Sequence, residues 1–160
     1  MSERVYQSRT NGRVADGAIS RRKVVLVLED HASVGGLIAG LVRQAGYRAV
    51  RAWGTHEATR LARGRRPDLI LLDLNLPYRD GLDLLQRLRS HEATRRCPVL
   101  IVAGEGLTLS VEERKLVSEV VTKPFDIDIM LNAVRNALGD PLVEVQPRQY
   151  DQQDHFLHGY

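Results

Sequence analysis

The chain has 160 residues, of which 23 are Lys or Arg and 20 are Asp or Glu, so its formal charge is +3. Hydrophobic residues make up 43% of the sequence and aromatic residues 5%, which predicts a single domain with an aliphatic core. The single cysteine, Cys97, excludes an intramolecular disulfide and a cysteine-based zinc site. No apolar run reaches the roughly 18 residues of a membrane-spanning helix, and the N-terminus has no signal-peptide pattern. We therefore expect a soluble, cytoplasmic protein without a membrane segment.

Charge is distributed unevenly between the two ends of the chain. The first 23 residues carry six basic and two acidic side chains, whereas residues 140–160 carry four acidic and one basic. We expect residues 1–21 to form a basic arm, residues 22–139 the folded domain, and residues 140–160 a C-terminal arm. Two solvated tails, or an association between arms or between chains, both fit this pattern. Gly, Asn and Ser dilute the basic residues, so no direct DNA binding is expected.

Short apolar strands alternate with amphipathic helices between the arms. The expected elements in chain order are strand 23–28, helix 31–45, strand 47–53, helix 55–63, strand 68–72, a helix through Leu82 to Leu88, strand 99–102, a short helix from Ser110, strand 120–122 and a helix from Asp126 to Leu138. This alternation predicts a doubly wound α/β fold, (βα)5, with a five-stranded parallel sheet in the flavodoxin-like order 2-1-3-4-5.

Local signals set the expected ends of the helices. Thr55 and Asp126 are expected to act as N-caps, and Ser110 with Glu113 forms a capping-box pattern. The residues expected to end helices are Gly46, Gly64 and Gly139.

Charged residues follow the carboxyl ends of three expected strands. Glu29 and Asp30 follow the first strand, Asp73 the third and Lys123 the fifth. Ligands of open parallel sheets bind at this edge, so the four side chains are expected to converge. The alternative is that each acid merely caps the next helix or turn.

Such a cluster has a specific chemistry. Three crowded carboxylates repel one another, and a divalent cation with oxygen ligands, Mg²⁺, removes that cost. A nearby lysine is suited to a phosphoryl oxygen. Carboxylate, metal and lysine together indicate phosphoryl transfer, with Asp73 as the nucleophile.

These residues resemble the receiver domain of bacterial two-component response regulators. The resemblance covers about residues 22–139, which would then be the receiver domain. The matching segments are Val24 to Asp30, Pro67 to Pro77, Asp80-Gly81, Pro98 to Val102, and Lys123-Pro124-Phe125.

The resemblance implies a role for each site residue. Asp73 would accept a phosphoryl group from a sensor histidine kinase, and Lys123 would hold the acyl phosphate, with a cis Lys123–Pro124 bond. Asp30 would bind Mg²⁺ directly, Glu29 through water, and Asn75 through its backbone carbonyl. Mn²⁺ is a candidate substitute for Mg²⁺.

Two positions depart from the family pattern. Ala103 stands where the family usually has Ser or Thr, and Val120 where it often has Tyr or Phe. The segment between Gly104 and Lys123 is also short, which predicts a reduced fourth helix. Phosphorylation is expected to persist, while its coupling to the usual output face is in question.

The loop after the fourth strand, with Gly104 and Glu105, would lie beside the phosphoryl group. Asn75 and Glu105 resemble residues of the chemotaxis response regulator that could orient a hydrolytic water. Their other interpretation is ordinary exposed loop residues.

Three functions remain open at this point. The leading one is a stand-alone response regulator that signals through a protein partner, because residues 140–160 are too few for an effector domain. Its C-terminal arm could dock on a second protomer and form a dimer, as in some regulators paired with phytochrome kinases. The alternatives are a pseudo-receiver that works without phosphorylation and a phosphate sink or shuttle in a phosphorelay.

A Mg²⁺-bound aspartate at a strand end is also found in hydrolases of the haloacid-dehalogenase type. That family needs a second Asp two residues after the nucleophile, where this chain has Asn75. We therefore expect no enzyme beyond the chain's own Mg²⁺-dependent phosphorylation and dephosphorylation.

Overall fold

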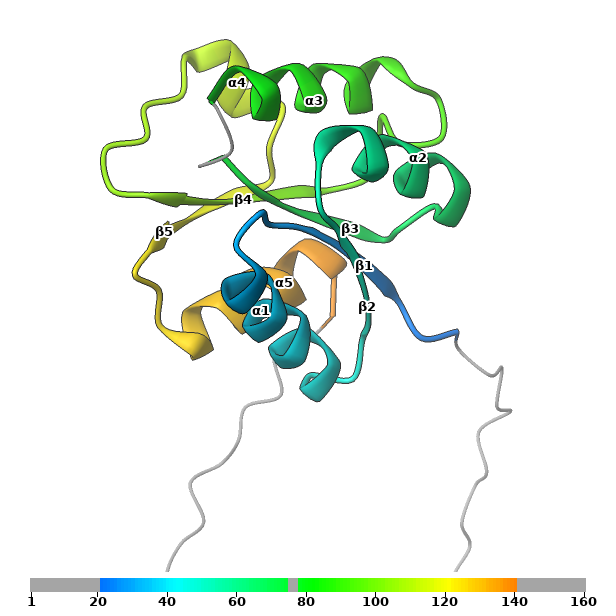
Figure 1. Ribbon diagram of the computed structural model, residues 1–160, viewed down its shortest axis with the longest axis vertical. Coiled ribbons are helices and arrows are strands. Elements are labelled where there is room, and N and C mark those ends of the chain that lie inside the picture. Colours follow the sequence, from blue (N-terminus) through cyan, green and yellow to red (C-terminus); the bar gives the residue numbers. More distant parts are fainter. Residues whose placement is uncertain (1–20, 75–77, 141–160) are drawn as a thin grey trace, which may run out of the picture.

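The computed structural model describes residues 21–74 and 78–140 of the chain. Five strands and five helices alternate within these residues, as the sequence predicts (Figure 1). The elements are β1 (Val24–Leu28), α1 (Ala32–Gln44), β2 (Arg48–Ala52), α2 (Thr55–Arg65), β3 (Leu69–Asp73), α3 (Tyr78–Ser90), β4 (Val99–Gly104), α4 (Val111–Lys115), β5 (Glu119–Lys123) and α5 (Ile127–Leu138).

The five strands form one parallel sheet in the order β2-β1-β3-β4-β5. This confirms the predicted flavodoxin-like order. The order reverses between β1 and β3, so their carboxyl ends flank the point where open α/β sheets bind ligands. The two strands that carry the predicted acids are therefore neighbours in the sheet.

Helices cover both faces of the sheet, which gives three layers (Figure 1). Helices α2, α3 and α4 lie on one face, and α1 and α5 lie on the other. Successive residues of β4 point to opposite faces: Ile101 packs in the core under α2 and α3, and Leu100 and Val102 pack under α1 and α5. Because both faces are buried, the central strands are continuously apolar.

Three strands extend one or two residues beyond their predicted ends. Asp73 and Lys123 are the last residues of β3 and β5, and β4 continues through Ala103 to Gly104. The parallel ladder explains the extension, since Asp73 pairs with Val102 and Gly104 with Lys123. The charged residues are thus fixed by the sheet itself.

Helix α2 corrects two predictions. Gly54 is its N-cap in place of Thr55, whose backbone carbonyl instead accepts a hydrogen bond from the Thr59 hydroxyl. The helix also continues through Gly64 to Arg65, because Arg66 adopts the left-handed conformation, with φ 45°, that ends it.

The remaining cap predictions are confirmed. Ser110 and Glu113 form a complete capping box, and Asp126 accepts hydrogen bonds from the first turn of α5. Gly46 and Gly139, with φ 96° and 68°, follow the ends of α1 and α5. Helix α4 has only five residues, as the short segment before Lys123 predicts.

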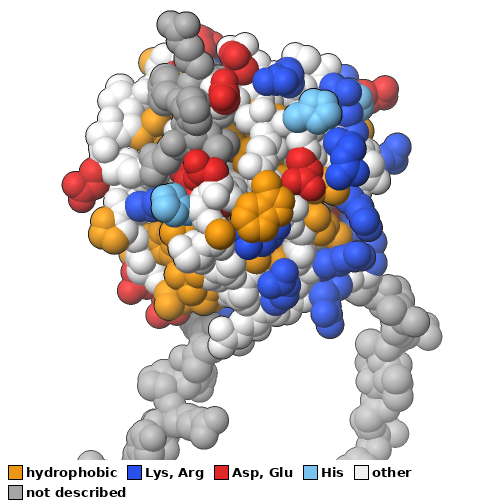
Figure 2. Space-filling model, viewed as in Figure 1, with side chains coloured by type: hydrophobic (Ala, Val, Ile, Leu, Met, Phe, Trp, Pro, Cys, Tyr) orange, Lys and Arg blue, Asp and Glu red, His pale blue; other side chains and the backbone are white. Residues whose placement is uncertain are grey.

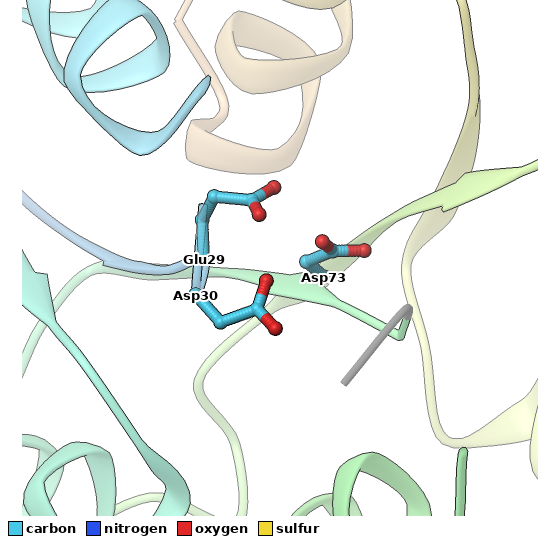
Figure 3. A group of neighbouring side chains, drawn as sticks. All are labelled: Glu29, Asp30 and Asp73. Carbon is cyan, nitrogen blue, oxygen red and sulfur yellow. The ribbon is translucent and has the colours of Figure 1, made fainter. Parts of the chain in front are cut away.

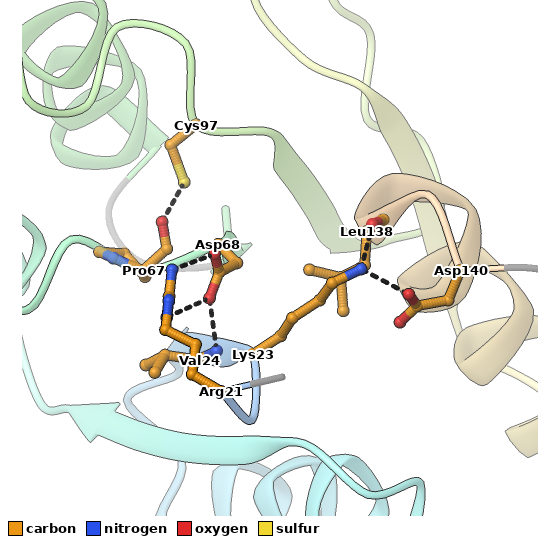
Figure 4. Close-up of polar contacts among 8 residues, drawn as sticks. All are labelled: Arg21, Lys23, Val24, Pro67, Asp68, Cys97, Leu138 and Asp140. Atoms are coloured by element: carbon orange, nitrogen blue, oxygen red, sulfur yellow. Dashed lines mark hydrogen bonds and ion pairs between the residues drawn. The ribbon is translucent and has the colours of Figure 1, made fainter. Parts of the chain in front are cut away.

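Polar contacts hold the chain at the amino ends of the strands (Figure 4). Arg21 forms a bidentate ion pair with Asp68, at 2.7 and 3.1 Å, and Asp68 also accepts the Val24 N–H. Lys23 donates to the Leu138 carbonyl and pairs with Asp140. The two ends of the described chain are therefore tied to the sheet edge opposite the acidic cluster.

The cysteine lies at the same edge. The Cys97 thiol donates to the Pro67 carbonyl at 3.2 Å (Figure 4), and burial raises its pKa to about 11. Across residues 21–74 and 78–140, every helix is too short or too polar to cross a bilayer. The predicted arms, residues 1–21 and 140–160, lie outside the described residues except for Arg21 and Asp140.

Candidate functional site

Three carboxylates meet at the carboxyl edge of the sheet (Figure 3). Glu29 and Asp30 extend from the end of β1, and Asp73 extends from the end of β3 toward the same space. One carboxylate oxygen from each lies within 4.8 Å of the other two. Glu29 and Asp73 are buried, whereas Asp30 is exposed, so the cluster is open on the Asp30 side. The predicted convergence is confirmed.

Lys123 completes the cluster from β5. Its Nζ donates to Glu29 Oε2 at 2.8 Å and to Asp73 Oδ2 at 2.9 Å. The Lys123 side chain is 21% exposed, whereas those of Glu29 and Asp73 are 1% and 2% exposed. One ammonium therefore partly compensates two buried charges, which alone would be costly to bury.

Burial and pairing oppose each other in the titration of the site. Burial raises the pKa of Glu29, and the hydrogen bond from Lys123 only partly offsets this effect. Burial disfavours the Lys123 ammonium, but hydrogen bonds to Glu29 and Asp73 outweigh it and raise the pKa of Lys123. Lys123 therefore remains a cation at neutral pH.

The donor set fits a magnesium ion. The three candidate ligands among the described residues are carboxylates, and Mg²⁺ prefers oxygen ligands at about 2.0–2.1 Å in an octahedral arrangement. Oxygens that share such an ion lie roughly 3–4 Å apart, which agrees with the grouping within 4.8 Å. Because Lys123 leaves part of the acidic charge uncompensated, a cation would also relieve repulsion among Glu29, Asp30 and Asp73.

The two atypical positions lie in the neighbouring strands. Ala103 is 2% exposed in β4, and its methyl group offers no hydrogen bond to the site. Val120, in β5, packs against the same core under α2, α3 and α4. The Ala103 backbone pairs with Thr122, the residue before Lys123. Ala103 lacks the hydroxyl, and Val120 the aromatic ring, that the family pattern places at these positions.

The structure describes three of the four remaining features predicted around the site. Gly104 ends β4, and Glu105 lies exposed in the following turn. The Lys123–Pro124 bond is cis, as the resemblance implies. Asn75, the predicted backbone ligand, lies outside the described residues.

The structure adds a packing role for Gly81 that sequence reasoning missed. A Cβ at this position of α3 would lie 2.4 Å from Leu74 Cδ2. Leu74 directly follows Asp73 and is 3% exposed. The absence of a side chain at Gly81 lets Leu74 pack beside the acidic strand end. The sequence shows Gly81 only as part of the Asp80-Gly81 motif, and that motif does not indicate a contact with Leu74.

Comparison with protein families agrees with the fold and the acidic edge. The family model described as response regulator receiver domain matches residues 25–135. The chain belongs to this family. Glu29, Asp30, Asp73 and Lys123 all fall within the matched residues.

Similar proteins include single-domain and longer regulators. The chain is 30% identical over 122 residues to the polar-differentiation response regulator DivK of Brucella anthropi, covering 74% of the chain and 98% of DivK. It is 33% identical over 109 residues to the phosphate regulon transcriptional regulatory protein PhoB of Pseudomonas aeruginosa, covering 64% of the chain and 46% of PhoB. The chain thus spans about half the length of PhoB and of RpaA of Synechocystis, with 46% and 48% covered.

Solved structures show the same architecture. The receiver domain of sensor histidine kinase PA1611 from Pseudomonas aeruginosa has a TM-score of 0.66 and 26% identity, covering 74% of this chain and 99% of that one. That structure has a magnesium ion coordinated in its active site cleft. The receiver domain of a LuxO repressor protein from Vibrio parahaemolyticus has a TM-score of 0.67 and 26% identity, covering 74% and 91%.

Proposed function

We propose that the chain is a response regulator whose Asp73 accepts a phosphoryl group from a histidine kinase. The observation that carries this proposal is the contact of Lys123 with both Asp73 and Glu29, with the Asp30 carboxylate beside them. We place the chain in the cytoplasm, where its output is a contact with a protein partner.

Asp73 acts as the nucleophile. A carboxylate oxygen of Asp73 forms a bond to phosphorus, while the phosphorus–nitrogen bond of a phosphohistidine breaks and its electron pair returns to the imidazole. Lys123 stays protonated and donates to a phosphoryl oxygen, which stabilises charge that develops during transfer. Because Asp73 and Glu29 are buried, the phosphoryl donor approaches from the side where Asp30 is exposed.

Glu29, Asp30 and Asp73 would hold Mg²⁺, together with the backbone carbonyl of Asn75. Bound Mg²⁺ would supply positive charge to the phosphoryl oxygens. Support comes from the all-oxygen donor set and from the magnesium in the similar PA1611 receiver domain. Mn²⁺ accepts the same ligands and is the proposed substitute.

The transmission of the signal departs from the family pattern. Ala103 has no hydroxyl to donate to the phosphoryl group, and Val120 is not the aromatic residue that the family pattern has as its rotating partner. This observation favours a second candidate, a pseudo-receiver that binds its partner without phosphorylation. A phosphate sink or shuttle would retain the phosphorylation of Asp73 without a change in the surface that binds a partner.

Incubation with acetyl phosphate and Mg²⁺, followed by intact mass, separates these candidates. We expect one phosphoryl adduct on the native chain and none after chelation of Mg²⁺. No adduct, under conditions that modify a known receiver domain, would favour the pseudo-receiver. An adduct that leaves hydrogen exchange unchanged across α4, β5 and α5 would favour the sink or shuttle. The kinase, and a dimer through residues 140–160, remain predictions.

A further inference from the structure

A basic groove runs between α2 and α3, away from the acidic cluster. It has a volume of about 490 Å³ and is lined by His56, Thr59, Arg60, Arg63 and Arg87. Four of these residues recur on one face of α2, and Arg87 lies in the last turn of α3. Figure 2 shows Lys and Arg side chains gathered along the margin where Figure 1 places α2.

The positive charge of this groove is largely uncompensated. Arg60 has one distant ion pair, with Glu57 at 3.7 Å. Within the described part of the chain, Arg63 and Arg87 form no ion pair, and Arg87 donates only to the Asp83 backbone carbonyl. Guanidinium groups present several fixed donors that match a carboxylate or phosphate. The groove therefore fits an anionic ligand.

The extent of the positive surface favours a short acidic segment over a long polyanion. Glu57, Asp80 and Asp83 lie on the same two helices and interrupt the basic residues. A nucleic-acid backbone carries regularly spaced charge and needs a continuous basic track. Isolated carboxylates on a peptide can instead meet single arginines.

The chain itself provides such a segment. Residues 141–160 contain Glu144, Asp151 and Asp154 against one basic residue, Arg148. The segment starts after Asp140, which Lys23 and Tyr47 hold at the amino ends of β1 and β2.

The groove lies within reach of this attachment point. Arg63 and Arg87 lie in the last turns of their helices, which lead into the amino ends of β3 and β4. Twenty residues can span up to about 70 Å, whereas a domain of this size has a radius of gyration of about 14 Å. We propose that residues 141–160 dock in the α2–α3 groove of the same molecule, with their carboxylates on Arg60, Arg63 and Arg87.

Cleavage by an arginine-specific protease at Arg148 tests this proposal in the full chain. The measured quantity is the rate at which residues 149–160 are released, followed by intact mass and compared with a free peptide of residues 141–160. We expect slower cleavage in the protein than in the peptide. Arg60→Glu/Arg63→Glu should raise the rate about threefold, as expected when two exposed ion pairs are lost.

A matched control carries the same change of charge elsewhere. Arg43→Glu/Lys115→Glu alters exposed residues in the last turns of α1 and α4, and its rate should equal that of the native chain. Arg60→Gln/Arg63→Gln should accelerate cleavage in the same direction without adding acidic charge. Combining Arg60→Glu/Arg63→Glu with Glu144→Lys, Asp151→Lys and Asp154→Lys should restore slow cleavage, because both charges of each ion pair are then reversed.

Three results would overturn the proposal. The first is equal cleavage rates in the native chain, the groove variants and the control. The second is protection that depends on protein concentration, which would assign the groove to the segment of a second copy. The third is binding of a short DNA duplex that Arg60→Glu/Arg63→Glu abolishes while cleavage at Arg148 is unchanged.

Discussion

Lys123 Nζ lies 2.9 Å from Asp73 Oδ2, although β4 separates the two strands that carry them. The long lysine side chain spans the end of β4, whose last residue, Gly104, pairs with Lys123 in the parallel ladder. The same ammonium contacts Glu29 of β1 at 2.8 Å. A single cation therefore links three strands of the sheet at their carboxyl ends.

Loss of this cation should destabilise the fold. Lys123→Met leaves the buried Glu29 and Asp73 carboxylates without their ammonium, so the free energy of unfolding without Mg²⁺ should fall by about 3 kcal/mol. Lys115→Met is the control, because Lys115 pairs with Glu112 on the exposed face of α4. It should cost at most about 0.5 kcal/mol. Urea unfolding measures both, and equal losses would contradict the role of Lys123.

The exposed acid of the cluster should control metal affinity. Asp30→Asn removes one charged ligand without removing a buried partner of Lys123, so Mg²⁺ should bind about tenfold more weakly by titration calorimetry. Asp83→Asn, an exposed acid on α3, should leave the affinity unchanged. Unchanged affinity in Asp30→Asn would remove this residue from the proposed metal site.

Two glycines of α1 should respond differently to the same substitution. Gly40→Ala places a methyl group in open space, and its better helix propensity should stabilise the protein by about 1 kcal/mol. At Gly35 a Cβ would lie 2.6 Å from Arg51 Nη2, and the Arg51 guanidinium is stacked on Trp53 at 4.0 Å. Gly35→Ala should therefore gain less than Gly40→Ala, because the flexible end of Arg51 must shift to make room for the methyl group.

A double variant separates this steric effect from helix propensity. Adding Arg51→Leu should make Gly35→Ala as favourable as Gly40→Ala, since the clashing nitrogen is gone. Thermal unfolding compares Gly40→Ala, Gly35→Ala, Arg51→Leu and the double variant. Equal stabilisation by Gly35→Ala and Gly40→Ala in the native background would contradict the close packing of Arg51 on α1.

The contacts of Asp140 should make stability depend on acid pH. Hydrogen bonds from Lys23 and Tyr47 hold the pKa of Asp140 below its ordinary value of 3.8. The ionised carboxylate therefore stabilises the fold above pH 3.8, and this contribution is lost as the pH falls through the lowered pKa. Asp140→Asn should be less stable than the native chain near neutral pH, with the difference shrinking below 3.8. A difference independent of pH would rule out this linkage.

Much of the site could be predicted because it depends on the positions of strand ends. Glu29, Asp30, Asp73 and Lys123 each come at the end of a short apolar run, and parallel strands bring those ends to one edge. Side-chain contacts between different elements could not be predicted in this way. Nothing in the sequence pairs Gly35 with Arg51 or Gly81 with Leu74, because these contacts join elements whose separation only the folded chain defines.

Some helix ends could also be predicted from the sequence and others could not. The Ser110–Glu113 box and the Asp126 cap depend on local side-chain hydrogen bonds, and both predictions are confirmed. Thr55 and Gly64 also have suitable residue types, but Gly54 and Arg66 adopt the required backbone conformations instead. Residue type alone could not decide between adjacent positions.

Asp73 is the proposed phosphoryl acceptor. The most direct test of this role is phosphorylation of the full chain with acetyl phosphate and Mg²⁺, followed by peptide mapping with tandem mass spectrometry. We expect a single phosphoryl group on Asp73, which Asp73→Asn eliminates and Asp83→Asn does not. A native chain that remains unmodified, or an adduct that persists in Asp73→Asn, would contradict it.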